Sequence, residues 1–175
     1  MSSPKMHCFN GRIDYETFEK HARNLSVISE SLFDTWSLQQ HDDQVYLVKH
    51  EKTRQNPNYK IEYHIVYSVA YSVPVLYFRI FRETGEIIWK EIPETVISWG
   101  KLSADESGRG LTQMPHPFFQ TPFFQLHPCH TAEWMRDLME NGKNENFNYI
   151  VAWLSFIAPH VGLYISEKYC SYNGT

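Results

Sequence analysis

The stretch from Tyr59 to Phe81 constrains the fold more than any other part of the chain, because it is dense in Tyr, Val, Ile and Phe. Aromatic and β-branched residues of this kind favour strands. Two long strands are therefore predicted, Tyr59 to Val73 and Val75 to Phe81. They are separated at Ser72-Val73-Pro74, where proline removes a ladder hydrogen bond.

Shorter β signals surround these two strands. Val45 to Lys49 predicts a short strand, and the polar segment Lys52 to Asn58 predicts a turn. The sequence Glu83-Thr84-Gly85-Glu86 predicts a tight turn into a strand from Ile87 to Trp89. Together these segments predict an antiparallel meander in the middle of the chain.

Helical patterns lie on both sides of the meander. From Asp14 to Phe33 the apolar residues recur at three- and four-residue steps, which predicts an amphipathic helix that covers one face of the sheet. Two further helices are predicted at Thr131 to Glu140, with Thr131 as N-cap, and at Tyr149 to Pro159. The segment Gly142 to Asn148 would join them.

The remaining segments predict less regular structure. Glu91 to Trp99 predicts a short helical stretch, and Gly100 to Gly110 predicts a surface loop. Between Met114 and Pro128 prolines interrupt two Phe-Phe pairs, which permits extended pieces but no regular helix. The fold class is therefore α+β, an antiparallel β meander flanked by helices. At 175 residues with 42% hydrophobic content, we expect residues 1–175 to form a single domain.

Charge, hydropathy and cysteine content argue against nucleic-acid binding, membrane insertion and a disulfide framework. A net charge of -4 leaves no basic surface for a phosphate backbone, so no nucleic-acid partner is expected. No apolar run reaches the roughly 18 residues that span a bilayer, and Met1 to Asn10 lacks the apolar region of a secretory signal. We therefore expect a cytoplasmic protein with no stable membrane insertion. The cysteines Cys8, Cys129 and Cys170 are widely spaced, which predicts reduced thiols rather than a disulfide framework.

The segment Leu126-His127-Pro128-Cys129-His130-Thr131 is the main candidate for chemistry. Cys129 precedes a predicted helix, whose positive dipole end favours thiolate over thiol. In an extended backbone His127 would project to the same side as Cys129, so a second polar group is available beside the sulfur. Cys129 and His127 are thus the candidate catalytic residues.

Other uses of these residues remain open. A lone cysteine is often buried packing. The donors His116, His127, Cys129 and His130 could bind zinc, but the chain offers no second close pair of Cys or His ligands with the usual spacing, so no metal and no cofactor are expected. A cysteine-protease dyad would need a histidine held by a third group, which the sequence does not identify.

Several motifs, in order, resemble the autophagy ubiquitin-like-conjugating enzymes. They are His127-Pro128-Cys129 with Trp134-Met135, the upstream run Tyr71 to Phe78, and the downstream Asn148-Tyr149-Ile150 with Trp153-Leu154. The resemblance covers roughly residues 59 to 165. It implies a fold similar to that of ubiquitin-conjugating enzymes, with Cys129 at the position that carries a tag protein as a thioester.

The resemblance also implies partners. The tag would be autophagy-related protein twelve, the activating enzyme autophagy-related protein seven, and the acceptor a lysine of autophagy-related protein five. A phospholipid-conjugating relative shares the His-Pro-Cys motif but has an acidic insertion and a membrane-sensing N-terminus. The helix Asp14 to Phe33 has an acidic balance that suits an anionic membrane poorly. A catalytically silent adaptor of the same fold is the remaining alternative.

The chain departs from ordinary ubiquitin-conjugating enzymes, in which a His-Pro-Asn motif precedes the cysteine. Here His116-Pro117 is followed by Phe118, so the amide is missing. His127 is the first candidate to replace it as a donor near the sulfur, and Tyr71 or Tyr67 is the second.

The aromatic residues could either pack in the hydrophobic core or line the site around Cys129. Core packing is expected for the phenylalanines Phe118, Phe119, Phe123 and Phe124, although an apolar wall beside Cys129 would ease deprotonation of an incoming lysine. An exposed edge of Tyr59 to Phe81 could dock the acceptor, with positions such as Ile61 or Tyr63 in the ladder, unless both edges are covered internally.

Overall fold

The computed structural model describes residues 8–54, 56–89, 111–141 and 147–171. Within these residues a seven-stranded sheet has the order β3-β4-β5-β6-β9-β8, with β7 also paired to β6. Every pair in it is antiparallel. Its strands are β3 (Ser37–His41), β4 (Gln44–Lys52), β5 (Tyr59–Ser68), β6 (Val73–Arg82), β7 (Ile87–Ile88), β8 (Leu111–Pro115) and β9 (Pro122–Leu126).

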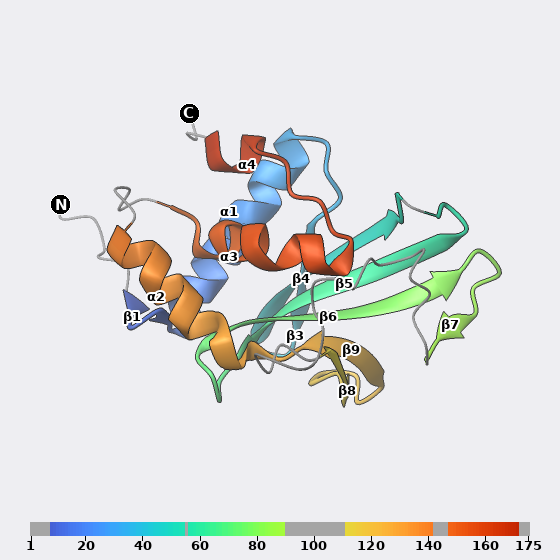
Figure 1. Cartoon of the computed structure of the whole chain (residues 1–175), viewed down its shortest axis with the longest axis horizontal. Helices are drawn as coiled ribbons and strands as arrows, with labels where there is room; N and C mark the ends of the chain where they lie inside the picture. The colour runs from blue at the N-terminus through green and yellow to red at the C-terminus, as the bar shows by residue number, and fades with distance from the viewer. Residues whose placement is uncertain (1–7, 55, 90–110, 142–146, 172–175) are drawn as a thin grey trace.

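Helices lie along one side and at one end of this sheet (Figure 1). They are α1 (Tyr15–Ser31), the 3-10 turn η1 (Pro128–His130), α2 (Thr131–Asn141), α3 (Tyr149–Ile157), η2 (Ala158–Val161) and α4 (Lys168–Ser171). A small hairpin of β1 (Cys8–Phe9) and β2 (Arg12–Ile13) precedes α1. Figure 1 shows α1, α3 and α4 on one side of the sheet and α2 at one end. The predicted α+β class and meander are confirmed, and no helix among the described residues is long and apolar enough to cross a membrane.

Both faces of the central strand β5 are covered, because buried residues follow one another along it without a polar alternation. Ile61, Tyr63 and Ile65 belong to the large core that includes residues of α1 and α3. The hydroxyl of Tyr63 donates to the carbonyl oxygen of Val161 at 2.8 Å, which joins the sheet to η2. Val66 belongs to a separate cluster on the second face.

The second face holds a buried polar chain. His116 is 0% exposed, and its Nε2 lies 3.0 Å from Nδ1 of His64. The backbone N–H of Phe118 donates to Nδ1 of His116, so the neutral imidazole carries its proton on Nε2 and donates to His64. His64 then faces Glu62 through Nε2 at 2.8 Å, and Arg79 also donates to Glu62. Burial lowers the pKa of His116 to about 3.

The predicted core role of the four phenylalanines is confirmed for two of them. Phe123 and Phe124 are buried. Phe118 stacks on His41 with ring centroids 4.9 Å apart, and Phe119 stacks on His116 at 4.6 Å. Phe118, Phe119 and Phe123 therefore surround the polar chain of the second face, whereas Phe124 stacks on Phe78 in the main core.

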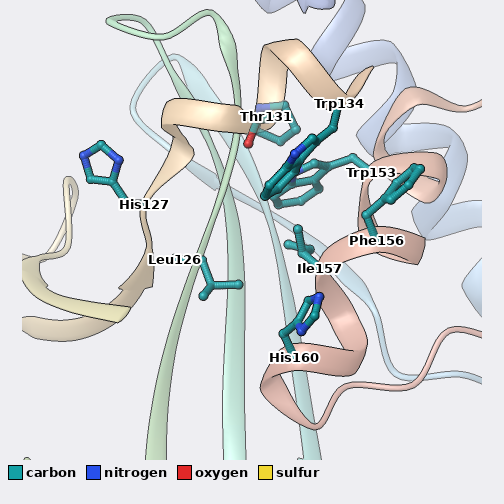
Figure 2. A pocket seen from close by; sticks show the side chains of 9 residues that line it. Leu126, His127, Thr131, Trp134, Trp153, Phe156, Ile157 and His160 are labelled. Carbon is teal, nitrogen blue, oxygen red and sulfur yellow. The ribbon is translucent and has the colours of Figure 1, made fainter. Parts of the chain in front are cut away.

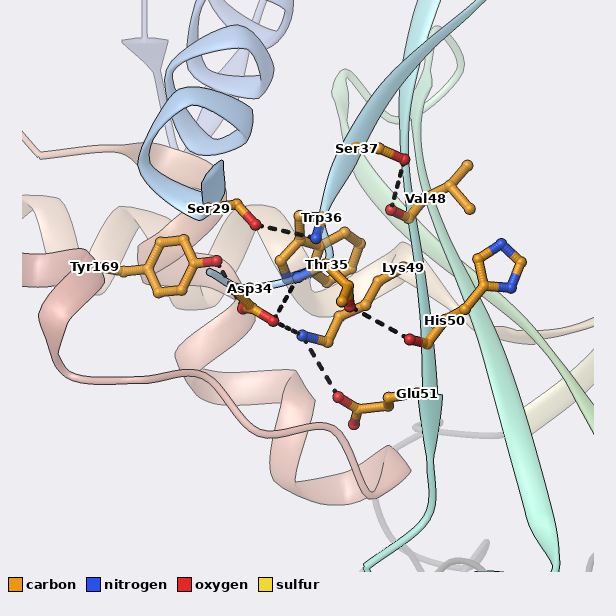
Figure 3. A network of polar contacts seen from close by, with 10 residues as sticks. All are labelled: Ser29, Asp34, Thr35, Trp36, Ser37, Val48, Lys49, His50, Glu51 and Tyr169. Atoms are coloured by element: carbon orange, nitrogen blue, oxygen red, sulfur yellow. Dashed lines mark hydrogen bonds and ion pairs between the residues drawn. The ribbon is translucent and has the colours of Figure 1, made fainter. Parts of the chain in front are cut away.

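A further polar network ties the C-terminal helix to the sheet (Figure 3). Lys49 of β4 is buried and forms ion pairs with Asp34 and Glu51. The hydroxyl of Tyr169 on α4 donates to Oδ2 of Asp34 at 2.7 Å. Burial raises the pKa of Asp34, but hydrogen bonds from Lys49, Tyr169 and the backbone of Thr35 outweigh it and hold that pKa below its usual value.

Three sequence predictions need correction or lie outside the described residues. The break between the long strands is the turn at residues 69–72, and Pro74 lies inside β6 opposite Tyr67. Proline is tolerated there because β6 pairs only with β5 at that point, and β9 joins it from Tyr77 onward. The predictions for Glu91 to Trp99 and Gly100 to Gly110 fall entirely on residues 90–110, outside the described residues.

The sequence left open whether Tyr59 to Phe81 has an exposed edge, and in the described sheet both edges of β5 are covered. β5 lies between β4 and β6, and β6 lies between β5 and the pair β7 and β9. Ile61 and Tyr63 are 1% and 0% exposed. Sequence alone could not show this, because a strand's neighbours depend on segments far away in the chain.

Candidate active site

Cys129 lies on the surface in η1, a 3-10 helix of one turn that runs directly into α2. Its side chain is exposed. The cap of this turn is His127, whose Nδ1 accepts a hydrogen bond from the Cys129 backbone N–H at 3.3 Å. The expectation that Thr131 caps the helix is wrong, because Thr131 already has helical dihedral angles and a buried side chain. The 3-10 turn moves the cap four residues toward the N-terminus.

His127 connects the cysteine backbone to Tyr71. The hydroxyl of Tyr71 lies 3.5 Å from Nε2 of His127, and the two rings meet edge to face with centroids 5.7 Å apart. Because Nδ1 of His127 accepts from Cys129, the neutral imidazole carries its proton on Nε2. That proton therefore faces the Tyr71 oxygen.

The turn that carries Tyr71 is held by backbone contacts. Ser72 has a positive φ of 55° and its N–H donates to the carbonyl oxygen of Ser68 at 2.7 Å. The N–H of Ile13 in β2 donates to the carbonyl oxygen of Ser72 at 3.0 Å. The tip of the β5–β6 hairpin is thus fixed to the N-terminal hairpin, which places Tyr71 beside His127.

Tyr67, the other tyrosine candidate, has a structural role. Its hydroxyl donates to the carbonyl oxygen of Ile13 at 3.0 Å, and its ring packs on Tyr15 and Phe18 of α1. The structure therefore brings Tyr71, and not Tyr67, to His127.

The other two cysteines differ from Cys129. Cys8 is partly buried, and its thiol donates to Sδ of Met139 at 3.2 Å. Burial, with a smaller contribution from the Asp14 carboxylate, raises the pKa of Cys8 to about 11, which disfavours its thiolate. Cys170 is exposed on the short helix α4.

Gly11, in the turn of the N-terminal hairpin, packs closely against the backbone of α2, the helix that follows Cys129. A Cβ atom at this position would lie 1.8 Å from the carbonyl oxygen of Ala132, in the first turn of α2. The carbonyl oxygen of Gly11 accepts from the Tyr149 hydroxyl of α3 at 2.6 Å. Only glycine, which is also free to adopt the φ of +76° found here, lets the hairpin approach α2 this closely.

An apolar pocket lies next to the cysteine-bearing turn (Figure 2). It has a volume of about 170 Å³. Figure 2 shows the indole rings of Trp134 and Trp153 beside Phe156 and Ile157, while the His127 ring at the rim points away from them. The complete lining is Pro74, Leu126, His127, Thr131, Trp134, Trp153, Phe156, Ile157 and His160.

This pocket was not predicted, and none of the four phenylalanines for which an apolar wall was considered contributes to its lining. The wall comes instead from α2 and from α3 with η2. One sequence signal could have found it, because Trp153, Phe156, Ile157 and His160 recur at positions i, i+3, i+4 and i+7 along one helical face.

The four residues that were considered as zinc ligands, and judged unlikely by their spacing to form a site, do not all lie at one place. His116 is buried on the second face of the sheet, whereas His130 faces Glu133 with Nδ1 to Oε2 at 3.3 Å. Within the described ranges no group of three or more His, Cys, Asp or Glu side chains could hold a metal ion.

Comparison with known proteins identifies similar chains. The family model described as "Autophagocytosis associated protein, active-site domain" matches residues 4–168. The human "Ubiquitin-like-conjugating enzyme ATG10" is 42% identical over 114 residues, which is 63% of this chain and 52% of the human protein. A protein of the same description from Arabidopsis thaliana is 35% identical over 123 residues, or 65% of this chain and 53% of the plant protein.

A solved structure supports the fold. The structure described as "Solution structures of KmAtg10" aligns with a TM-score of 0.50 at 15% identity and covers 85% of this chain and 94% of its own. The chain spans about half the length of the curated relatives it matches.

Proposed function

Because the chain belongs to the family of autophagocytosis-associated proteins with an active-site domain, we propose that it is a ubiquitin-like-conjugating enzyme with Cys129 as its nucleophile. The observation that carries this proposal is the placement of an exposed Cys129 on a capped turn, with His127 and Tyr71 beside it. The relatives named above are described as enzymes of this kind.

The reaction has two acyl transfers. In the first, the Cys129 thiolate attacks the carbonyl carbon of the tag's C-terminal glycine and expels the thiolate of the activating enzyme. In the second, the neutral amine of an acceptor lysine attacks the Cys129 thioester, forms an isopeptide bond and expels the Cys129 thiolate. The proton lost by the lysine amine passes to solvent or to a base on the acceptor.

His127 and Tyr71 are proposed to act in the second transfer. Negative charge develops on the thioester oxygen during attack, and donors near that oxygen stabilise it. The pair offers two polar hydrogens, the hydroxyl of Tyr71 and Nε2–H of His127, whose contact with the Tyr71 oxygen is long at 3.5 Å and would be exchanged for one with the thioester oxygen. Their connection to the Cys129 backbone through Nδ1 of His127 supports this role.

The tag, the activating enzyme and the acceptor are proposed by family resemblance. They are autophagy-related proteins twelve, seven and five, respectively, and the reaction is placed in the cytoplasm. Cys8 and Cys170 are not assigned a role in the transfer.

A loading assay tests this function. With tag, activating enzyme and ATP, the native protein should form an adduct that thiol reductant removes. Cys129→Ser should form an oxygen ester that survives reductant, and Cys129→Ala should form none, whereas Cys170→Ser should load normally. Normal conjugation by Cys129→Ala would overturn the proposal. Supplying the acceptor protein and, separately, vesicles that contain phosphatidylethanolamine tests the acceptor class, since only the protein should receive the tag.

A further inference from the structure

One groove on the second face of the sheet borders the turn that carries Tyr71. It has a volume of about 600 Å³, which gives room for several side chains of a partner. Its lining includes Ser68, Val69 and Ala70, which directly precede Tyr71 in the chain. The β3–β4 hairpin, strands β5 and β6, and the connection between β8 and β9 contribute the rest. We call this cavity the second-face groove.

The floor of the second-face groove is apolar. Val66 and Val75 lie opposite each other in β5 and β6, and both belong to the lining. Phe118 forms a wall and stacks on His41, with ring centroids 4.9 Å apart. Val69, two residues before Tyr71, is 74% exposed. An apolar side chain of a partner gains free energy by leaving water at this place.

The carboxylates that line the second-face groove give it a negative charge. Asp42 and Asp43, in the turn between β3 and β4, are exposed and belong to the lining, which contains no Lys or Arg. The only lining group that can become positive is the imidazole of His41, whose Nδ1 lies 3.5 Å from Oδ2 of Asp42. A cleft lined by charge of one sign attracts the opposite charge. The second-face groove therefore fits a cationic side chain next to an apolar one.

This charge selects among the possible occupants. The whole chain has a net charge of -4, so a second copy would bring further negative charge to the aspartates. Nucleic acid and anionic lipid are repelled for the same reason. A basic segment of a protein remains, and the acceptor is the protein that must be held without a covalent bond while it reacts. Its attacking lysine is itself cationic until it loses a proton, because the free side chain has a pKa of about 10.4.

We propose that the second-face groove docks a segment of the acceptor protein in which a Lys or Arg lies beside an apolar residue. The basic side chain pairs with Asp42 and Asp43, and the apolar residue covers Val66 and Val75. The inference rests on the proposed function, because it assumes that an acceptor attacks a thioester on Cys129. Docking beside the Tyr71 turn holds the acceptor near the thioester and makes the attack effectively intramolecular.

A discharge assay with the full chain tests this docking. Cys129 is first loaded with tag by the activating enzyme and ATP, and EDTA then stops further loading by removing Mg²⁺. The acceptor protein is added at increasing concentration, and the decay of the thioester gives a maximal rate and a half-saturating acceptor concentration. Discharge to free lysine, run in parallel, reports on Cys129 without docking.

Asp42→Asn combined with Asp43→Asn removes both charges and keeps the shape of the side chains. Asparagine also tolerates the φ of 50° at Asp42. We expect the half-saturating acceptor concentration to rise about fivefold, because two exposed ion pairs are lost. The maximal rate and the rate with free lysine should stay at their native values. Raising NaCl from about 0.05 M to about 0.5 M should raise the half-saturating concentration more for the native protein than for the variant.

Matched variants separate docking from general effects. Glu83→Gln combined with Glu86→Gln removes two exposed carboxylates from the turn after the opposite end of β6, and it should leave the half-saturating concentration unchanged. Val69→Ala removes exposed apolar surface of the groove and should raise that concentration about threefold. Val27→Ala, at an exposed apolar position on α1, is the control for Val69→Ala.

A native half-saturating concentration in the double asparagine variant would overturn the docking site, and so would an equal rise in the double glutamine control. Slower loading with native discharge in the double asparagine variant would assign the groove to the tag or the activating enzyme, and would overturn the acceptor as its occupant. Native values in Val69→Ala would overturn the apolar half of the site. Failure of the proposed function differs from all of these, because it appears as absence of a Cys129 adduct before any acceptor is added.

Discussion

Tyr71 and His127 meet at the tips of two different elements, with the tyrosine hydroxyl 3.5 Å from Nε2 of the imidazole. The other imidazole nitrogen accepts from the backbone of Cys129. A substitution at either residue should therefore act on the same step of the reaction.

His127→Ala should leave loading intact and slow discharge to the acceptor. The thioester oxygen becomes negative only during attack, and loss of one donor at such an oxygen lowers the rate on the order of 100-fold. The loaded intermediate should accumulate in a single-turnover assay. Discharge at the native rate would show that His127 only caps the turn.

Tyr71→Phe should slow discharge by a smaller factor, about fivefold to tenfold, because it keeps the ring contact with His127 and removes one neutral hydrogen bond. In the double variant with His127→Ala the effects should not add, since the two groups act as a unit. Tyr67→Phe is the control. Its hydroxyl bonds to Ile13, so stability should fall by about 1 kcal/mol while the discharge rate of the folded protein is retained.

Gly11→Ala should destabilise the protein and disturb the cysteine-bearing helix. The added Cβ would lie 1.8 Å from the carbonyl oxygen of Ala132, so the hairpin or α2 must move. We expect a loss of about 3 kcal/mol in urea unfolding and slower loading. Gly85→Ala is the matched control, because Gly85 also has a positive φ but has nothing within 4 Å of an added Cβ. It should cost only about 1 kcal/mol, and equal losses would contradict the steric explanation.

Stability should fall as the pH is lowered from 7 to 5. Burial lowers the pKa of His116 from 6.5 to about 3 and that of His21 from 6.5 to about 4. Between these folded-state pKa values and the unfolded value of 6.5, the unfolded chain binds more protons than the folded chain. The stability that the two neutral histidines contribute is therefore present above about pH 6.5 and is lost as the pH falls below it. Each histidine should contribute a loss of about 2 kcal/mol by pH 5.

Urea titrations at pH 7 and pH 5 measure this loss, and His116→Gln should make it smaller. The carboxylates Glu62 and Asp34 have lowered pKa values and act only below about pH 4.5, outside this window. An identical loss in His116→Gln and in the native protein would show that the buried chain is not responsible.

Lys49→Met should cost about 3 kcal/mol, because it leaves Asp34 and Glu51 without their shared cation in a poorly hydrated site. Tyr169→Phe removes a single hydrogen bond to Asp34 and should cost about 1.5 kcal/mol. Lys52→Met is the control at an exposed position of the same strand. A cost as large for Lys52→Met as for Lys49→Met would contradict the network in Figure 3.

Local patterns predicted much of the described fold. Helix α1 begins and ends within two residues of its prediction, because apolar periodicity and the Asp14 cap, which accepts from the Thr17 N–H, are both local. The prolines between Met114 and Pro128 correctly predicted extended structure, which forms the hairpin of β8 and β9. Strand β3 was missed, since its sequence Ser-Leu-Gln-Gln-His has little β propensity and pairs on one side with β4.

The sequence by itself determined the candidate nucleophile, Cys129, and its position just before a helix, because a His-Pro-Cys segment ahead of a helical pattern is a property of consecutive residues. Only the tertiary structure decided which groups surround it. Tyr71 reaches His127 across 56 positions of sequence, and His64 reaches His116 across 52. Likewise, the pocket wall comes from α2 and from α3 with η2. Such contacts depend on how hairpins and helices pack against one another. A pattern of neighbouring residues does not show which distant segments will come into contact.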